Sequence, residues 1–187
     1  MQRITTSEYK KMYASGKAPD VRNQIRGAQN KRNGDLFEEM IKKACDIYKS
    51  KAQAFIQKTP EPMKVLKPIP NQPGRFIACF QKKAQPDFKG VLKGGKAVEF
   101  DAKHTNKDRI EKSCISSEQA DCLDAMMEMD AMCFVAVSFG FNEFFRVPWG
   151  VWKNMKQIYG RQYLKPEDIE QYKVPYDMKN GAVMFLD

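Results

Sequence analysis

The sequence predicts an α/β protein in which a mixed central sheet is flanked by helices. Apolar residues recur at helical spacing over 35–51, ahead of the first strand pattern. A near-continuous apolar run at 131–139 is typical of a strand that is covered on both faces. Two β-prone runs meet at Gly94-Gly95, which favours a hairpin because both glycines tolerate positive φ. The 187 residues suffice for one domain with a substantial core.

The first half of the chain predicts a helix, a strand and a proline-spaced segment. The helix spans 35–51, with Asp35 as its N-cap, and the first strand spans 54–58. Five prolines between positions 60 and 73 argue against a central strand or a helix. A second strand is predicted at 76–80, and it leads into the hairpin of residues 86–105.

The second half predicts helices alternating with strands. Ser116, Ser117 and Glu118 cap a helix that runs to about 129. The apolar strand 131–139 follows, and then an edge strand at 144–147. Pro148 opens a helix to 159, because proline suits a first helical position, and one more short helix is predicted at 165–172.

Charge and cysteine usage bound the class of partner and the compartment. The net charge of +9 favours a polyanion, nucleic acid first and an anionic membrane surface second. Residues 1–33 predict a mobile basic arm, either phosphate-contacting through Arg26 and Arg32 or merely solubilising, ahead of a domain over 34–187. No 18-residue apolar window and no secretory signal occur. Five cysteines without a Cys-x-x-Cys motif and a lone His104 indicate free thiols in a reducing cytoplasm.

The second strand of the hairpin carries the chemistry. Side chains alternate faces along a strand, so one set enters the core and the other set shares a polar face. The core set is Val98, Phe100 and Ala102, and the polar set is Glu99, Asp101, Lys103 and Thr105. Asp87 on the partner strand brings a further carboxylate to the polar face.

A hard divalent cation binds one or two carboxylates together with water and substrate phosphate. Asp87 and Asp101 supply such carboxylates, and Lys103 supplies an ammonium that can hold a water or stabilise negative charge on a phosphate. The pattern therefore predicts a metal-dependent nuclease site. The alternative is a solvated strand face with a surface ion pair, which contributes about 0–1 kcal/mol.

Pro86-Asp87 followed by Asp101-Ala102-Lys103 resembles the PD-(D/E)XK nuclease signature. More narrowly, Asp87-Phe88-Lys89-Gly90 with Val98-Glu99-Phe100-Asp101-Ala102-Lys103-His104-Thr105 resembles the RecU family of Holliday junction resolvases. That family typically has Glu where this chain has Asp101, and Asp where it has Glu99. The two acids are thus exchanged in type, and either carboxylate can ligate a metal.

The resemblance implies a restriction-endonuclease-like sheet and further site residues. Glu38 stands where the family has a Glu after its Gly-x-x-Leu, and it corresponds to a helix acid that faces the active site; a plain helix-dipole role is the alternative. Gln119 corresponds to a family Gln at the metal or water site; a solvent-exposed amide is the alternative. Gln85 stands where the family often has a metal-binding Thr. A Thr-Pro sequence implies a protruding stalk over 60–78, whose basic residues meet phosphates. These are Lys64, Lys67 and Arg75, and Thr105 of the hairpin motif is a further expected DNA contact.

The expected function is a structure-selective DNA endonuclease that cuts four-way junctions with Mg²⁺ or Mn²⁺. Two symmetric cuts imply a homodimer, and recombination proteins are further expected partners. Two alternatives remain open. One is a nuclease of the same superfamily that acts on duplex or flap DNA, and the other is a non-catalytic DNA-binding protein with this fold.

Overall fold

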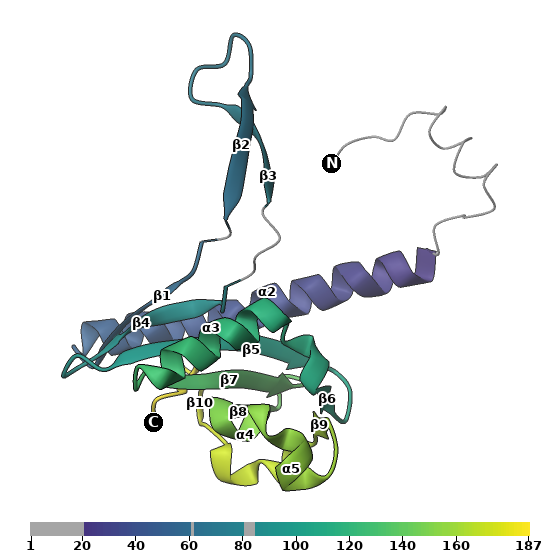
Figure 1. Ribbon diagram of the computed structural model, residues 1–187, viewed down its shortest axis with the longest axis vertical. Coiled ribbons are helices and arrows are strands. Elements are labelled where there is room, and N and C mark those ends of the chain that lie inside the picture. Colours follow the sequence, from purple (N-terminus) through teal and green to yellow (C-terminus); the bar gives the residue numbers. More distant parts are fainter. Residues whose placement is uncertain (1–20, 61, 81–84) are drawn as a thin grey trace. The chain divides into compact units, whose positions relative to one another are not determined.

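A computed structural model of the chain describes residues 21–60, 62–80 and 85–187 (Figure 1). The chain divides into two compact units, Met1–Asn33 and Gly34–Asp187. No helix among the described residues is both long enough and apolar enough to cross a membrane.

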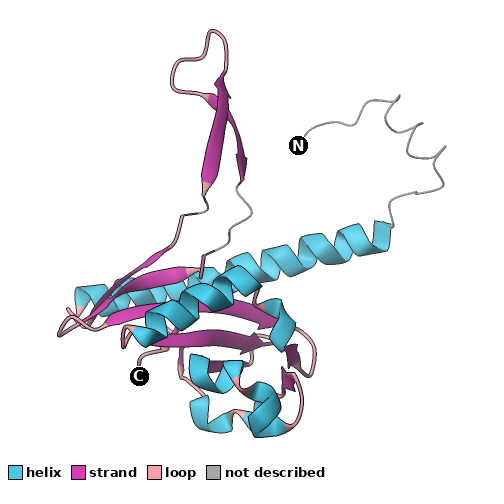
Figure 2. Cartoon of the chain, viewed as in Figure 1, coloured by secondary structure: helices cyan, strands magenta, loops and turns pink. Residues whose placement is uncertain are grey.

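A five-stranded mixed sheet organises the second unit (Figure 2). Its strand order is β1-β4-β5-β7-β8, and only β5 and β7 run parallel. The strands are β1 (Ala54–Lys58), β4 (Phe88–Leu92), β5 (Ala97–Thr105), β7 (Met132–Phe139) and β8 (Glu143–Pro148). These strands lie where the sequence patterns place them, and the predicted mixed α/β class is confirmed.

One face of the sheet is covered by helix α2 (Val21–Ser50), from Gly34 onward, and by the C-terminal segment. Phe88, Phe100 and Phe134 stack in a row across three neighbouring strands, with ring centroids 5.0 and 4.3 Å apart. The buried ring of Phe185 lies 5.0 Å from that of Phe100 and 5.2 Å from that of Tyr48 on α2. The last residues of the chain therefore fill the core of their own subunit.

The opposite face is covered over β5 and β7 by helix α3 (Ser117–Glu128) (Figure 1). Leu123 of α3 joins a second core with Val135, Val137 and Trp152. The helices α4 (Trp149–Lys153) and α5 (Met155–Tyr159) also contribute to this core. Over β1 and β4 the same face stays open, since Phe55 and Val91 are exposed.

Two predicted helices differ from the structure. The helix predicted from Pro148 to 159 is broken at Asn154, whose side-chain amide donates to Gly150 O at 2.9 Å and so competes with the helical backbone bonds. The helix predicted at 165–172 consists of two 3-10 helices, η2 (Pro166–Asp168) and η3 (Glu170–Tyr172). Asp168 Oδ2 accepts from Lys165 N at 2.8 Å and so caps the N-terminus of η2.

The helix predicted to begin at Asp35 begins at Val21 instead. Residues 21–33, expected to belong to an arm without regular structure, contain no proline and several good helix formers such as Gln, Arg, Ala and Lys. This stretch has no apolar stripe, and charged residues can continue a helix without one. Residues 1–20 of the predicted arm lie outside the described residues, and the division of the chain at 33/34 into arm and nuclease domain stays a prediction.

The segment predicted as a stalk contains a hairpin of β2 (Met63–Pro68) and β3 (Phe76–Phe80), which form a two-stranded sheet of their own. Every residue of β2 is exposed, as a protruding stalk requires. A register shift between Val65 and Lys67 keeps Lys64 and Lys67 on one face and puts Met63, Val65 and Pro68 on the other. The remaining short elements are β6 (Ile110–Glu111), η1 (Lys112–Cys114), β9 (Tyr163–Leu164), β10 (Tyr176–Asp177) and β11 (Ala182–Val183).

Candidate active site

The turn between β4 and β5 sets the register that brings the candidate acids together. Gly94 and Gly95 both adopt positive φ, at 94° and 92°, as the hairpin requires. The resulting register pairs Phe88 with Phe100, so Asp87 at the start of β4 lies beside the β5 residues that follow. Its Oδ2 accepts a hydrogen bond of 3.0 Å from Ala102 N. Asp87 and Asp101 are thereby directed to the same place.

Asp101 is fully buried on the face that α3 covers. Its Oδ1 accepts a hydrogen bond from Gln119 Nε2. Its Oδ2 lies 2.5 Å from Lys103 Nζ, in an ion pair, and receives no well-oriented hydrogen bond from any described residue. Burial raises the pKa of Asp101 to about 7; the charge of Lys103 opposes this rise and the neighbouring Asp87 adds to it. A buried carboxylate oxygen is left facing a second carboxylate.

Lys103 is the cation of this cluster. Its own burial lowers the pKa, but the charges of Asp101 and Asp87 outweigh burial and raise the pKa above the ordinary value of lysine. Lys103 therefore stays protonated at neutral pH. Its ammonium can meet a phosphate oxygen beside the two carboxylates, with Asp101 as its anchor.

Gln119 holds Asp101 from the first turn of α3. Ser116 is the N-cap of that helix, and its Oγ accepts from Gln119 N at 3.2 Å. In return Gln119 Oε1 accepts from Ser116 N at 3.1 Å, which completes a capping box. Since the amide oxygen is used in this way, the amide nitrogen is directed at Asp101. Gln119 therefore orients Asp101, and its predicted place at the metal or water site stays a prediction. The alternative of a solvent-exposed amide is wrong because Gln119 is buried.

The structure places two other predicted residues next to the site rather than in it. Glu99 shares the polar face with Asp101, is buried, and accepts from Cys122 Sγ at 3.4 Å. Burial raises the pKa of Glu99, and the thiol hydrogen bond and the nearby Lys89 oppose this. Glu99 and the exposed Gln85 line a separate pocket of about 400 Å³ between β4 and α3.

Glu38 and Thr105 have other partners. Glu38 on α2 forms an ion pair with Lys58 at the end of β1. Thr105 Oγ1 accepts from Lys107 N at 3.1 Å and closes the turn after β5. Within the described ranges, no group of three or more His, Cys, Asp or Glu side chains is arranged to hold a metal ion. The carboxylates that meet are therefore the pair Asp87 and Asp101.

The basic residues that are predicted to contact DNA lie on the β2–β3 hairpin and on helix α2. Lys64 and Lys67 share the basic face of the β2–β3 hairpin, and Arg75 at its tip donates to Gln72 Oε1 at 3.1 Å. Arg26 and Arg32 are exposed on the first part of α2, before Gly34. Their contacts with DNA stay predictions.

Sequence reasoning missed Thr59 as a neighbour of the acids. Its backbone N donates to Asp87 O at 2.8 Å. Its Oγ1 is buried and has no hydrogen-bond partner among the described residues. The Thr-Pro dipeptide at the exit of β1 was the available signal, but it indicates a change of chain direction and not the position of a hydroxyl. The backbone of Thr59 is thus tied to that of Asp87, and its hydroxyl is a further buried oxygen at the exit of β1.

The donor set fits a hard divalent cation. Asp87 lies close enough to raise the cost of ionising Asp101, and a cation between the two carboxylates would remove that cost. Apart from its ion pair with Lys103, the buried Asp101 Oδ2 has no hydrogen-bond partner among the described residues. Mg²⁺ usually takes one or two carboxylates and completes its shell with water and phosphate.

The chain is similar to proteins of known sequence and of known structure. The model of the family described as RecU, Recombination protein U, matches residues 32–187. The Holliday junction resolvase RecU of Streptococcus sanguinis is 27% identical over 174 residues, which cover 83% of this chain and 86% of the relative. The protein of the same name from Bacillus subtilis is 23% identical over 164 residues, covering 83% and 78%. Among solved structures, Archaeoglobus fulgidus Hjc, a Holliday junction resolvase, aligns with a TM-score of 0.44 and 12% identity, covering 80% of this chain and 97% of that one.

Proposed function

The chain belongs to the RecU family, and on that premise we propose that it is a structure-selective DNA endonuclease that resolves four-way (Holliday) junctions. The reaction is metal-dependent hydrolysis of a phosphodiester bond. The observation that carries this proposal is the convergence of Asp87 and Asp101 beside the ammonium of Lys103. The sequence resemblance pointed to the same family.

Asp87 and Asp101 would hold the ion, Mg²⁺ or Mn²⁺. When bound, such an ion supplies a Lewis acid and a water molecule made more acidic by coordination. Gln119 fixes the orientation of Asp101 through Oδ1 and leaves Oδ2 directed at Asp87 and Lys103. Helix α3 excludes bulk water from this face, since Asp101 is fully buried beneath it.

Lys103 stabilises the negative charge that builds up on the phosphate in the transition state. Its pKa is raised by Asp101 and Asp87 in spite of burial, so the ammonium form is maintained. In this partly buried setting a fixed positive charge acts more strongly than in water. Asp101 also holds the lysine in place, because Nζ and Oδ2 are 2.5 Å apart.

A four-way junction is cut at two symmetric positions, so the proposal includes a two-fold homodimer that presents two sites. The net charge of +9 supports an extended DNA contact. Lys64, Lys67 and Arg75 of the hairpin, and Arg26 and Arg32 of α2, are its proposed phosphate contacts. We further propose a cytoplasmic location and recombination proteins that supply the junction.

The test is cleavage of a labelled four-way junction with and without Mg²⁺ or Mn²⁺. Asp101→Asn is expected to abolish nicking while junction binding is retained. Asp121→Asn removes a carboxylate from an exposed position of α3 and serves as the matched control, with full activity.

Equal cleavage of the junction by wild type and Asp101→Asn would remove Asp101 from the site. Equal cleavage of junction and linear duplex would favour a nuclease without junction selectivity. Binding without cleavage of any DNA in either metal would favour a non-catalytic DNA-binding protein.

A further inference from the structure

We propose that a second DNA-binding site lies at the far end of β1 and β4 and holds the backbone of the junction arm that leaves the cleavage site. The inference rests on the proposed function for the identity of its ligand. The site is a pocket of about 240 Å³ on the open part of the sheet. It is lined by Lys49, Ala52, Gln53, Ala54, Phe55, Val91, Leu92 and Lys93.

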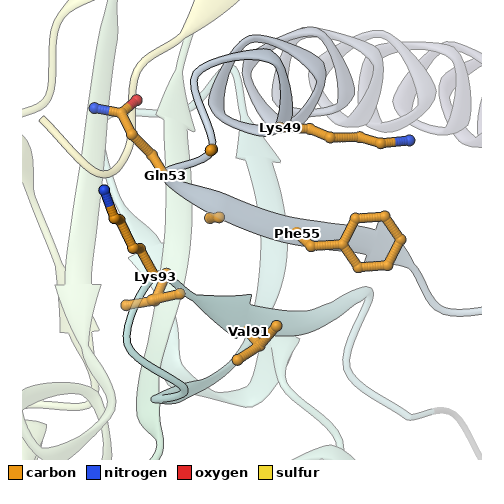
Figure 3. A pocket seen from close by; sticks show the side chains of 8 residues that line it. Lys49, Gln53, Phe55, Val91 and Lys93 are labelled. Carbon is orange, nitrogen blue, oxygen red and sulfur yellow. The ribbon is translucent and has the colours of Figure 1, made fainter.

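The pocket combines an apolar floor with a basic rim. Phe55 is 44% exposed and Val91 39% exposed, and the two residues pair across β1 and β4, so they form one exposed apolar surface. Figure 3 shows Lys49 extending past Phe55, while Lys93 and Gln53 lie on the other side of the pocket. Lys49 Nζ is 5.3 Å from the centroid of the Phe55 ring. The apolar surface is thus bordered by ammonium groups on two sides.

Backbone hydrogen bonds hold the walls of the pocket in place. At the end of α2, Ala52 N donates to Lys49 O at 3.1 Å and Gln53 N donates to Tyr48 O at 2.9 Å, which form a Schellman motif. Lys93 N donates to Gln53 O at 2.7 Å and ties the β4–β5 turn to this motif. The two lysine-bearing segments are therefore joined to each other directly, and the pocket is preformed.

The charge of the pocket suits a phosphodiester. None of the described residues that line it is acidic. Neither Lys49 nor Lys93 has an ion-pair partner in the part of the chain that the structure describes. Two unpaired ammonium groups beside exposed apolar surface match a nucleotide backbone, in which phosphates alternate with deoxyribose rings.

Strand register places the pocket on the same sheet face as the acids. Lys89 pairs with Glu99, and Phe55 pairs with Val91, so these alternate positions all share the face of Asp101. Val91 stands four residues after Asp87, a distance of about 14 Å at about 3.4 Å per residue. One strand of B-DNA advances by about 3.4 Å per nucleotide, so the pocket lies about four nucleotides from the scissile phosphate.

The occupant is accordingly one strand of a duplex arm. Its phosphates meet Lys49 and Lys93, and the deoxyribose between them lies against Phe55 and Val91. The contact carries no base recognition and extends the footprint of the enzyme along the arm.

The test measures binding of a labelled four-way junction by fluorescence anisotropy in EDTA, across a series of salt concentrations. The logarithm of the association constant falls linearly with the logarithm of the salt concentration. Each lost phosphate contact makes this line shallower by about 0.9. Lys49→Gln and Lys93→Gln are each expected to show this shallower salt dependence. Both should also bind the junction more weakly, whatever the base sequence of its arms. Lys96→Gln is the matched control, since Lys96 is an exposed lysine of the same turn that does not line the pocket, and its slope should equal that of wild type. Phe55→Ala should weaken binding by about tenfold with the slope unchanged.

Slopes of Lys49→Gln and Lys93→Gln that equal the slope of Lys96→Gln would overturn the proposal. A second outcome would also overturn it. If the variants change the molar mass of the protein in light scattering and leave its DNA affinity unchanged, the pocket is a contact between copies of the chain. Junction cleavage by wild type in Mg²⁺ is scored separately. Wild type that binds with the expected slopes but cuts no DNA would refute the nuclease function and leave the arm contact standing.

Discussion

Replacing Asp101 with Asn tests how the buried carboxylate couples protonation to folding. The Asp101 side chain is fully buried, and its pKa of about 7 stands against an ordinary value of 3.8. The folded protein therefore holds this proton more tightly than the unfolded chain does. Stability from this residue is fully present below about pH 4 and is lost as the pH rises through about 7. The apoprotein is thus expected to be less stable at neutral pH than in mild acid.

The size of the effect follows from the two pKa values. Between pH 5 and pH 7 the unfolded chain has released the proton and the folded chain retains it. The free energy of unfolding therefore falls by about 1.36 kcal/mol for each pH unit. From pH 5 to pH 8 the loss amounts to about 3 kcal/mol. Asn cannot titrate, so Asp101→Asn should not show this loss. The free energy of unfolding of the variant, relative to that of wild type, should therefore rise by about 3 kcal/mol from pH 5 to pH 8.

Urea denaturation of both proteins in EDTA at pH 5, 6, 7 and 8 measures this difference. All other titrating groups are shared, so the comparison isolates the Asp101 cluster. Added Mg²⁺ should restore stability to wild type at pH 8 and leave Asp101→Asn unchanged, because a ligand stabilises only the protein that binds it. A constant difference between the two proteins across the pH range would refute the argument that burial raises the pKa of Asp101 in the folded protein.

Three further substitutions test the framework around the site. Gly90→Ala should cost about 3 kcal/mol or prevent folding, because a Cβ there would stand 2.1 Å from Phe55 O; denaturation that matches wild type would contradict this close approach. Ala52→Gly should raise the free energy of unfolding by about 1 kcal/mol, since Ala52 has a φ of 52° at a helix end that favours glycine; unchanged stability would argue against that strain. Gln119→Leu should lower the single-turnover cleavage rate and leave junction affinity intact, because Asp101 Oδ1 loses its donor; a wild-type rate would show that Gln119 does not position the carboxylate.

Local sequence patterns predicted the hairpin and its polar face because both are encoded within twenty residues. The Gly94-Gly95 turn fixes the register, and alternation then decides which side chains share a face with Asp101. The strand at 131–139 could be predicted equally well, because a continuous apolar run of this length is typical of a strand covered on both faces.

Contacts between distant elements could not be predicted in the same way. The burial of Gln119 depends on how α3 crosses β5, and an amide in a first helical turn carries no sign of that crossing. Similarly, Glu38 meets Lys58 because α2 and the end of β1 lie together, which a helical pattern alone does not specify. The start of α2 at Val21 was missed because its first turns carry no apolar stripe, and periodicity is the main signal for a helix.

The central claim is that Asp87 and Asp101 jointly hold one divalent cation. Calorimetric titration of Mn²⁺ into the DNA-free protein tests it most directly, with Asp87→Asn, Asp101→Asn and the control Asp121→Asn alongside wild type. The account predicts one site in wild type and in the control, and its loss in both of the other variants. Retention of the wild-type affinity in either Asp87→Asn or Asp101→Asn would contradict it.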